Sequence, residues 1–360
     1  MYKSAGRKGI HHAATRVFWL EYGVFLPSLP IFVLIVFVVS QYFYNFIQKF
    51  RRMTKLWISL FCTLLLAACG GRQPNEVATR SIYYWRTTFR LDSSERAFLR
   101  MHHVKKLYVR YFDVTPDDEM HPMPNATITF ADTLPQGVEI VPVVFIVNRF
   151  QAGSIDDIAD QVFRRILQMN ETHDIKGIRE IQIDCDWTMS TQKRYFSMLR
   201  RMRDLCHEHK LTLSATIRLH QLSLEVPPVD KGTLMMYNTG DFTQLSVHKP
   251  ILDMKDVRPY LHSLSRYKLP LNVAYPLFTW RVLFRDGKYV GIMHGDDDFP
   301  VLQGDSVATR QPELDDIMAA RRAVDSLRPD ANSEVILYHL NNKNINRFTP
   351  NDYENIYQQH

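Results

Sequence analysis

Two aspartates in the segment 178–187 have the spacing of side chains on one face of a β-strand. The segment contains the run IQIDCDW, in which apolar and polar residues alternate. Because successive side chains point to opposite faces of a strand, Asp184 and Asp186 are expected on the same face, about 7 Å apart. Neighbouring carboxyls repel when both are charged, so their pKa values separate and one can act as an acid and the other as a base. The alternative is an internal ion pair with Arg110 or Arg218.

Other side chains suited to binding a sugar lie where further strands are expected to end. The aromatic ones can stack on the apolar ring faces of a sugar, and the charged and amide ones can bond to its hydroxyls. These candidate substrate-binding residues are Arg110, Asp113, Trp187, Arg218, His220, Tyr237, Asn238, Tyr275, Trp280, Tyr338 and His339. Asp184, Asp186 and Asp241 are the candidate catalytic carboxylates, with Asp113 as an alternative partner of the acid.

Eight runs of strand length explain why these side chains would meet. They occur at 81–89, 106–113, 139–147, 178–187, 211–220, 233–239, 269–278 and 334–340. Helical patterns separate several of them, at 94–103, 154–170, 191–209, 254–267 and 312–327. Strands that alternate with helices pair in parallel, and eight such units close into a barrel. We therefore predict an α/β fold, a (β/α)8 TIM-like barrel over residues 79–360, with its site at the C-terminal ends of the strands.

Two connections depart from the regular alternation. Residues 114–138 show no helical pattern. Residues 280–311 are predicted to form a hairpin insertion, because Asp286-Gly287 stands between two apolar runs. This insertion is expected to project over the top of the barrel as a lid.

In the strand at 211–220, alternation gives one polar face, which would point into the barrel.

The strand ends resemble those of chitinase-type glycoside hydrolases. The fourth strand of that family ends in a pattern such as Asp-x-Asp-Trp-Glu, which Asp184, Asp186 and Trp187 match. The run Met235-Met236-Tyr237-Asn238 is similar to the family's Met-x-Tyr-Asp. The resemblance covers residues 81–340. It implies a barrel that handles sugars carrying an acetamido group.

Both matches stop short of the residue that performs the chemistry in that family. Thr188 stands where the resemblance places a general acid glutamate, and Asn238 stands where it places an aspartate that positions the acetamido group. In the family the acetamido oxygen attacks the anomeric carbon, so the leaving group needs that acid. Two functions remain open. One is a hydrolase whose acid is Asp184 or Asp186, with a pKa raised by burial; the other is a glycan-binding or scaffolding protein without catalysis.

A third interpretation is a metal-dependent hydrolase. Its ligands would be Asp184, Asp186, His220 and His339, because histidines and carboxylates suit zinc or manganese. The His-x-His run His207-Glu208-His209 lies at the end of a predicted helix and includes none of these four residues, and the sequence has no His-Glu-x-x-His spacing. The sequence also contains no Gly-rich phosphate loop and no Gly-x-Ser-x-Gly run. We therefore expect no metal and no cofactor.

The net positive charge of the chain belongs to its first 68 residues. The sequence has 44 basic and 38 acidic residues, a formal charge of +6. Residues 1–68 hold eight of the basic residues and one of the acidic ones, which leaves 36 basic and 37 acidic residues in the remainder. A basic surface must lie on the folded part to bind nucleic acid, so no nucleic-acid partner is expected.

Residues 53–68 have the pattern of a secretory signal peptide. The run MTKLWISLFCTLLLAAC combines a basic start, an apolar stretch and small residues before a cysteine. Its end, Leu66 to Cys69, resembles the lipobox of bacterial lipoproteins, which implies cleavage before Cys69 and lipidation of its thiol. Residues 69–78 would then be a flexible tether. We expect an exported protein that a lipid on Cys69 anchors to a membrane of the bacterial cell envelope.

A second apolar run lies upstream, at 24–47, and is long enough to span a bilayer. Residues 1–52 are therefore either an N-terminal membrane helix or an upstream extension of the reading frame, with the natural start at Met53.

Overall fold

The computed structural model describes residues 38–44, 46–47, 78–119, 121–149, 155–293, 295 and 298–358. The chain divides by its contacts into two units, residues 1–74 and residues 75–360. The expected signal peptide, Cys69 and the tether up to residue 77 lie outside the described residues. Within the described part of the chain, no helix is both long and apolar enough to cross a bilayer.

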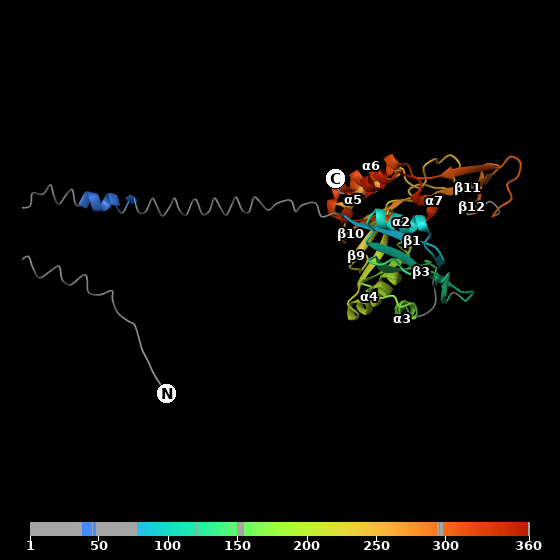
Figure 1. The fold of residues 1–360 in the computed structure, drawn as a ribbon, viewed down its shortest axis with the longest axis horizontal. Helices are drawn as coiled ribbons and strands as arrows, with labels where there is room; N and C mark the ends of the chain where they lie inside the picture. Colours follow the sequence, from blue (N-terminus) through green and yellow to red (C-terminus); the bar gives the residue numbers. More distant parts are fainter. Residues whose placement is uncertain are drawn as a thin grey trace, which may run out of the picture. The chain divides into compact units, whose positions relative to one another are not determined.

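Eight parallel strands form the closed sheet that the sequence predicts (Figure 1). Closure follows from β1, which pairs in parallel with β14 on one side and with β3 on the other. The eight strands are β1 (Thr79–Tyr84), β3 (Lys106–Pro116), β6 (Glu139–Ile146), β7 (Glu180–Asp184), β8 (Thr212–Arg218), β9 (Lys231–Met235), β10 (Leu271–Pro276) and β14 (Glu334–Tyr338). The prediction of a TIM-like barrel is confirmed.

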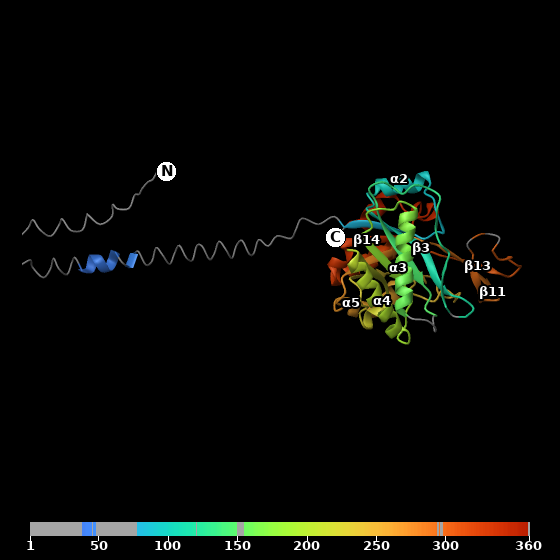
Figure 2. The same cartoon turned by 90° about the horizontal axis from the view of Figure 1, so that it is seen from below.

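Helices cover the outside of this barrel (Figure 2). They are α2 (Ser93–Met101), α3 (Ile155–Thr172), α4 (Gln192–Glu208), α5 (Met254–Leu264), α6 (Leu314–Leu327), α7 (Asn342–Ile345) and α8 (Pro350–Tyr357). Short 3-10 helices, η1 (Leu219–Ser223) and η2 (Pro329–Ser333), follow β8 and α6. Local sequence explains their positions. In α2, for example, Asp92 and Glu95 form a reciprocal capping box at the first turn, which fixes where the helix starts.

The connection at 114–138 contains no helix, as the sequence indicates. It holds β4 (Pro122–Asn125), which pairs antiparallel with the end of β3, and β5 (Thr129–Phe130), which pairs with β2 (Thr88–Phe89). These short strands extend the barrel wall on one side.

The insertion after β10 is a three-stranded antiparallel sheet rather than a simple hairpin. It consists of β11 (Trp280–Arg285), β12 (Lys288–Met293) and β13 (Ser306–Arg310), with β11 in the middle. Asp286 and Gly287 form the turn between β11 and β12, with φ of 49° and 73°. Positive φ at both turn residues is what a tight hairpin requires, and it explains the Asp-Gly pair. The sheet projects from the barrel (Figures 1 and 2).

The barrel strands divide their side chains between two cores. In β8, Leu213, Ala215 and Ile217 are buried against the helices, whereas Ser214 and Thr216 bond to side chains of β7 inside the barrel. A smaller cluster inside the barrel contains Tyr83 and other apolar side chains from several strands. The interior is therefore partly polar and partly aromatic, as the alternation in β8 predicts.

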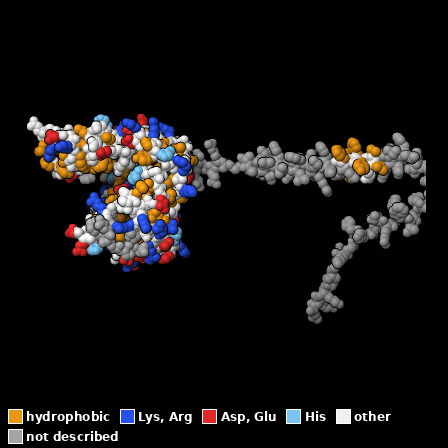
Figure 3. Space-filling model, turned by 180° about the vertical axis from the view of Figure 1, so that it is seen from behind, with side chains coloured by type: hydrophobic (Ala, Val, Ile, Leu, Met, Phe, Trp, Pro, Cys, Tyr) orange, Lys and Arg blue, Asp and Glu red, His pale blue; other side chains and the backbone are white. Residues whose placement is uncertain are grey.

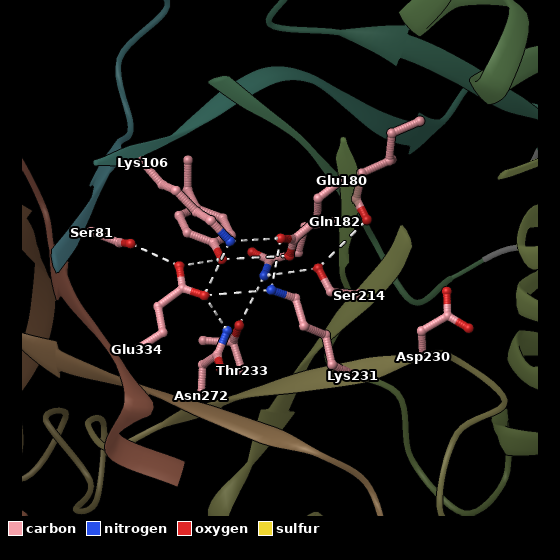
Figure 4. A network of polar contacts seen from close by, with 12 residues as sticks. Ser81, Lys106, Glu180, Gln182, Ser214, Asp230, Lys231, Thr233, Asn272 and Glu334 are labelled. Carbon is pink, nitrogen blue, oxygen red and sulfur yellow. Dashed lines mark hydrogen bonds and ion pairs between the residues drawn. The ribbon is translucent and has the colours of Figure 1, made fainter. Parts of the chain in front are cut away.

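Four charged residues close the barrel at the N-terminal ends of its strands (Figure 4). Lys106, Glu180, Lys231 and Glu334 are each the first residue of their strand. Lys231 Nζ lies 2.7 Å from Glu180 and 3.4 Å from Glu334, and Lys106 Nζ lies 3.4 Å and 3.3 Å from the same two carboxylates. The Tyr108 hydroxyl donates to Glu334 at 2.9 Å. This buried network fills the interior at the end opposite to the expected site.

Candidate functional site

A cavity of about 680 Å³ opens at the C-terminal ends of the barrel strands. Its walls come from the strand ends and from the insertion, which overhangs a notch in the molecular surface (Figure 3). The lining residues are Trp85, Arg110, Asp113, Phe145, Asp184, Arg218, Tyr237, Asn238, Phe278, Thr279, Trp280, Arg281, Ile292, Met293, Tyr338, His339, Asn341, Lys343 and Asn344. The structure therefore brings together most of the residues that sequence reasoning selected, from segments more than 200 positions apart.

Five of the selected residues do not line the cavity. Trp187 is fully buried behind the strand, 5.1 Å from Phe196 of α4 between ring centroids. Tyr275 also points outward, and its hydroxyl donates to Asn332 of η2 at 2.9 Å. Both side chains lie on the side of their strands that faces the helices. They do not line the cavity, in contrast to the expectation that they contact a ligand. The remaining three are Asp186, His220 and Asp241, which the structure places in exposed positions around the rim.

Arg218 bridges the paired aspartates of the fourth barrel strand. Asp184 accepts hydrogen bonds from Thr216 Oγ1 at 2.6 Å and from Arg218 Nη2 at 3.1 Å. The Nε of the same guanidinium donates to Asp186. The two carboxylates differ in environment, since the Asp184 side chain is 6% exposed and that of Asp186 is 60% exposed. The internal ion pair weighed as an alternative is the arrangement that forms.

The pKa values of this cluster follow from its burial. Burial raises the pKa of Asp184, against the opposing effects of the Arg218 charge and the Thr216 hydrogen bond. Burial would lower the pKa of Arg218, but attraction to Asp184 and Asp186 outweighs it and the pKa is raised. The guanidinium is therefore always charged, and it bonds to one carboxylate oxygen, Oδ1, of each aspartate.

A second ion pair depends on a bulge in β3. The pairing of β3 with β6 shifts between Arg110 and Phe112, so that Tyr111 is an extra residue. The shift moves Asp113 onto the same face as Arg110, where simple alternation would separate them. Arg110 Nε donates to Asp113 at 2.7 Å, and its guanidinium lies 5.6 Å from the ring centroid of Trp85. This pair forms part of the cavity wall.

Five aromatic side chains form a continuous wall along the cavity. Trp85 and Tyr338 lie 5.6 Å apart between ring centroids, and Tyr338 lies 5.1 Å from Tyr237. Phe278 continues the row at 5.7 Å from Tyr237 and 5.1 Å from Trp280. Sequence reasoning missed Trp85 and Phe278, although both lie within the predicted strands 81–89 and 269–278. Such a wall suits the apolar faces of sugar rings.

The positions that depart from the chitinase-type pattern carry no carboxylate. The Thr188 hydroxyl bonds to its neighbours in the loop before α4, 2.9 Å from Ser190 Oγ. Asn238 has φ of 55°, a conformation that asparagine tolerates better than most residues.

His339 is neutral near pH 7, because burial lowers its pKa to about 4. Among the described residues no three His, Cys, Asp or Glu side chains are grouped to hold a metal ion.

Comparison with protein-family models and with curated protein sequences gives no match. Comparison with solved structures gives several. The chitinase from Chromobacterium violaceum ATCC 12472 superposes with a TM-score of 0.52 at 11% identity, over 78% of this chain and 98% of that one. A glycoside hydrolase family 18 N-acetylglucosaminidase from Paenibacillus barengoltzii gives 0.50 at 11% identity, over 79% and 100%.

The spore cortex-lytic enzyme SleL from Bacillus megaterium QM B1551 gives a TM-score of 0.50 at 12% identity, over 80% of this chain and 75% of that one. At identities this low, the superpositions establish a common fold and nothing further. The chain is therefore a TIM barrel of the form found in chitinase-like glycoside hydrolases, as its strand ends suggested.

Proposed function

We propose that the barrel binds a glycan in the cavity at the C-terminal ends of its strands and does not hydrolyse it. The observation that carries this proposal is the bidentate position of Arg218, which holds Asp184 and Asp186 together. The charge of Arg218 favours the ionised form of both carboxylates and so opposes the protonated form that a general acid needs. Thr188 offers no substitute, since a hydroxyl is far too weak an acid for that role.

The shape of the cavity supports a sugar as the ligand. The aromatic wall from Trp85 to Trp280 offers stacking surface, and Asp113, Asn238 and Asn341 offer polar atoms for hydroxyl and acetamido groups. The cavity also has the position at which TIM barrels place their ligands. These features hold whether or not turnover takes place.

Hydrolysis remains a second candidate because of one observation. Asp184 lines the cavity and burial raises its pKa, which is the property of a general acid. For this candidate, a bound substrate must displace Arg218 from Asp184. The barrel would then be an enzyme whose acid is formed only in the complex.

One experiment separates the two candidates. The purified full chain is incubated with β-linked oligosaccharides, and both binding and the release of reducing ends are measured. We expect binding that Tyr237→Ala weakens at least tenfold, without release of reducing ends. Asp204→Asn, an exposed position on α4, is the matched control for Asp184→Asn. Release that Asp184→Asn abolishes and Asp204→Asn leaves unchanged would establish the hydrolase, and no binding to any sugar would refute both candidates.

We also propose that a lipid on Cys69 anchors the chain to the bacterial cell envelope. The support is the sequence, namely the signal-like run 53–68 and the lipobox-like residues that end at Cys69. Mass spectrometry of the mature N-terminus should find an acylated cysteine as its first residue. Cys69→Ser should abolish acylation and release the protein from membranes, whereas Cys62→Ser should have no effect. An unmodified peptide that runs through Cys69 would refute the anchor.

A further inference from the structure

The barrel has a face of basic residues at the N-terminal ends of its strands, which we call the basal face. Six exposed cations lie in the connections that lead into β3, β7, β8 and β10, and parallel strands place all these connections at one end of the barrel. They are Arg100, Lys105, Arg179, Lys210, Arg266 and Lys268. None of the six has an ion-pair partner among the residues that the structure describes.

Acidic residues balance this face only in part. Three carboxylates lie at the same end of the barrel: Glu171 and Glu208 near the ends of α3 and α4, and Glu139 as the first residue of β6. Other acids there are already bound, as Asp174 is to Lys176 at 2.8 Å. Six cations against three carboxylates leave an excess of +3. The chain after residue 68 has 36 basic and 37 acidic residues, so the basal face is positive on a part that is nearly neutral overall.

A depression of about 420 Å³ lies within the basal face. Arg100, His103 and Lys105 line it together with Arg96, and no acidic residue does. Leu99, Val104, Pro135 and Val138 are apolar residues that also line it. Positive side chains next to apolar ones suit a phosphate group that is attached to a hydrophobic or glycerol moiety.

The position at which the chain enters the barrel connects this face with the proposed anchor. Ala78 directly precedes β1, and the Lys105 amide donates to the Arg80 carbonyl at 2.8 Å, so the entry point lies beside the basic depression. Both ribbon views place the start of β1 at the opposite end of the barrel from the insertion (Figures 1 and 2). Nine peptide units separate Cys69 from Ala78, and they span at most about 30 Å.

We propose that the basal face lies against the membrane and binds anionic phospholipid headgroups, so that the glycan cavity at the other end points away from the bilayer. The proposal rests on the proposed anchor at Cys69, which would hold this face within reach of the headgroups. Anionic lipids attract clusters of four to eight basic residues near a membrane surface, and the six cations of the basal face fall in that range.

The test uses the full chain and its own lysines as reporters. The lipidated protein is added to vesicles of phosphatidylcholine, alone or with phosphatidylglycerol, and the acetylation rate of each lysine is measured by mass spectrometry. Lys105, Lys210 and Lys268 should react at least tenfold more slowly on the phosphatidylglycerol vesicles. Lys288 and Lys343, at the other end, should react equally on both. High salt should remove the protection, because it screens surface charge.

Variants that leave the basal reporters Lys105, Lys210 and Lys268 in place test the role of charge. The combined variant Arg100→Gln, Arg179→Gln and Arg266→Gln removes three basal charges and should restore the acetylation rates at least tenfold.

The matched control removes three charges from the helix starts and the hairpin at the cavity end. This control variant is Lys193→Gln, Lys255→Gln and Lys288→Gln. It should keep the protection at the basal face, and its loss there would refute the proposal.

The remaining outcomes are distinct. Equal acetylation on the two kinds of vesicle, or protection of Lys343 instead, would overturn the membrane-facing basal face. Equal protection by inorganic phosphate in solution would also overturn it, since the site would then take free phosphate. Flotation with phosphatidylcholine vesicles reports on the anchor alone. If the chain fails to float with them, the anchor is refuted. The lysine protection on phosphatidylglycerol vesicles still shows whether the basal face binds the membrane.

Discussion

At the scale of single residues, Arg218 controls the stability of the site because it is the counter-charge of the buried carboxylate of Asp184. We predict that Arg218→Met lowers the free energy of unfolding by about 3–5 kcal/mol, since the substitution leaves a buried carboxyl without its partner. Asp186→Asn should cost less than about 1 kcal/mol, because that carboxylate is largely exposed. Urea denaturation of the three proteins measures both effects. Equal losses in the two variants would show that burial does not distinguish the two carboxylates.

A second residue, His339, gives the barrel a dependence on pH. Burial lowers its pKa to about 4 in the fold, whereas an unfolded histidine titrates near pH 6.5. The unfolded chain therefore binds this proton first, so stability is full above about pH 6.5 and declines as the pH falls towards 4. The decline amounts to about 3 kcal/mol. His339→Gln should abolish this part of the pH profile in thermal unfolding, while the exposed His103→Gln should leave the profile unchanged.

Residue-level reasoning from the sequence found the polar side chains at the strand ends but not how they pair. Alternation placed Asp184 and Asp186 on one face, and they are there. The sequence did not decide whether Arg110 or Arg218 pairs with the two aspartates. In the structure the partner is Arg218, which lies on β8, the strand next to β7. It also assigned Trp187 and Tyr275 to the site by type, although strand alternation directs both towards the helices.

At the scale of elements, the four charged residues at the strand starts form a unit that ties distant strands together. Burial would raise the pKa of Glu334, but Lys231 and Lys106 outweigh that effect and the pKa is lowered. Stability from this carboxylate is therefore present above the ordinary pKa of glutamate and is lost as the pH falls through the lowered value. We predict that Glu334→Gln costs about 3–5 kcal/mol at neutral pH, since it removes the charge of a buried carboxylate that balances two partly buried lysines.

Urea denaturation from pH 7 to pH 3 checks the prediction for Glu334. The difference between the wild type and Glu334→Gln should shrink as the pH falls. Glu171→Gln, an exposed residue near the end of α3, provides the control and should change stability by less than about 0.5 kcal/mol. A difference that stays constant with pH would mean that the charge of Glu334 does not supply the stability.

The elements were predictable where hydrophobic periodicity is strong. All eight barrel strands and the five long helices fall within a few residues of their predicted bounds. Apolar residues recur with a fixed period in each of them, and this period distinguishes a strand from a helix. The bulge at Tyr111 and the third strand of the insertion have no such signal. The bulge follows from the pairing of β3 with β6, and β13 needs β11 as a partner. The basal ion network likewise joins first residues of strands that are far apart in the sequence.

At the scale of the whole barrel, its last helix packs against its first strand. The C-terminal helix α8 packs below the first strand, where the Tyr357 hydroxyl donates to the Ser81 carbonyl at 3.1 Å. Glu354 lies 2.9 Å from Arg80 and 2.7 Å from His102. Closure of the barrel between β1 and β14 thus coincides with the packing of α8, so the last residues are part of the common core.

We therefore predict that damage to α8 unfolds the whole barrel in one step. Tyr353 is 1% exposed and packs edge-on against Phe98 of α2 at 4.9 Å between ring centroids. Tyr353→Ala should cost about 3–5 kcal/mol and lower the thermal midpoint, because it opens a cavity between α8 and α2. Far-ultraviolet and near-ultraviolet circular dichroism should give the same midpoint, as a single cooperative unit requires. Tyr289→Ala on the exposed part of the insertion should hardly move that midpoint. An early transition in the variant that leaves the other helices intact would instead mean that α8 is a separate unit, and that the barrel closes without it.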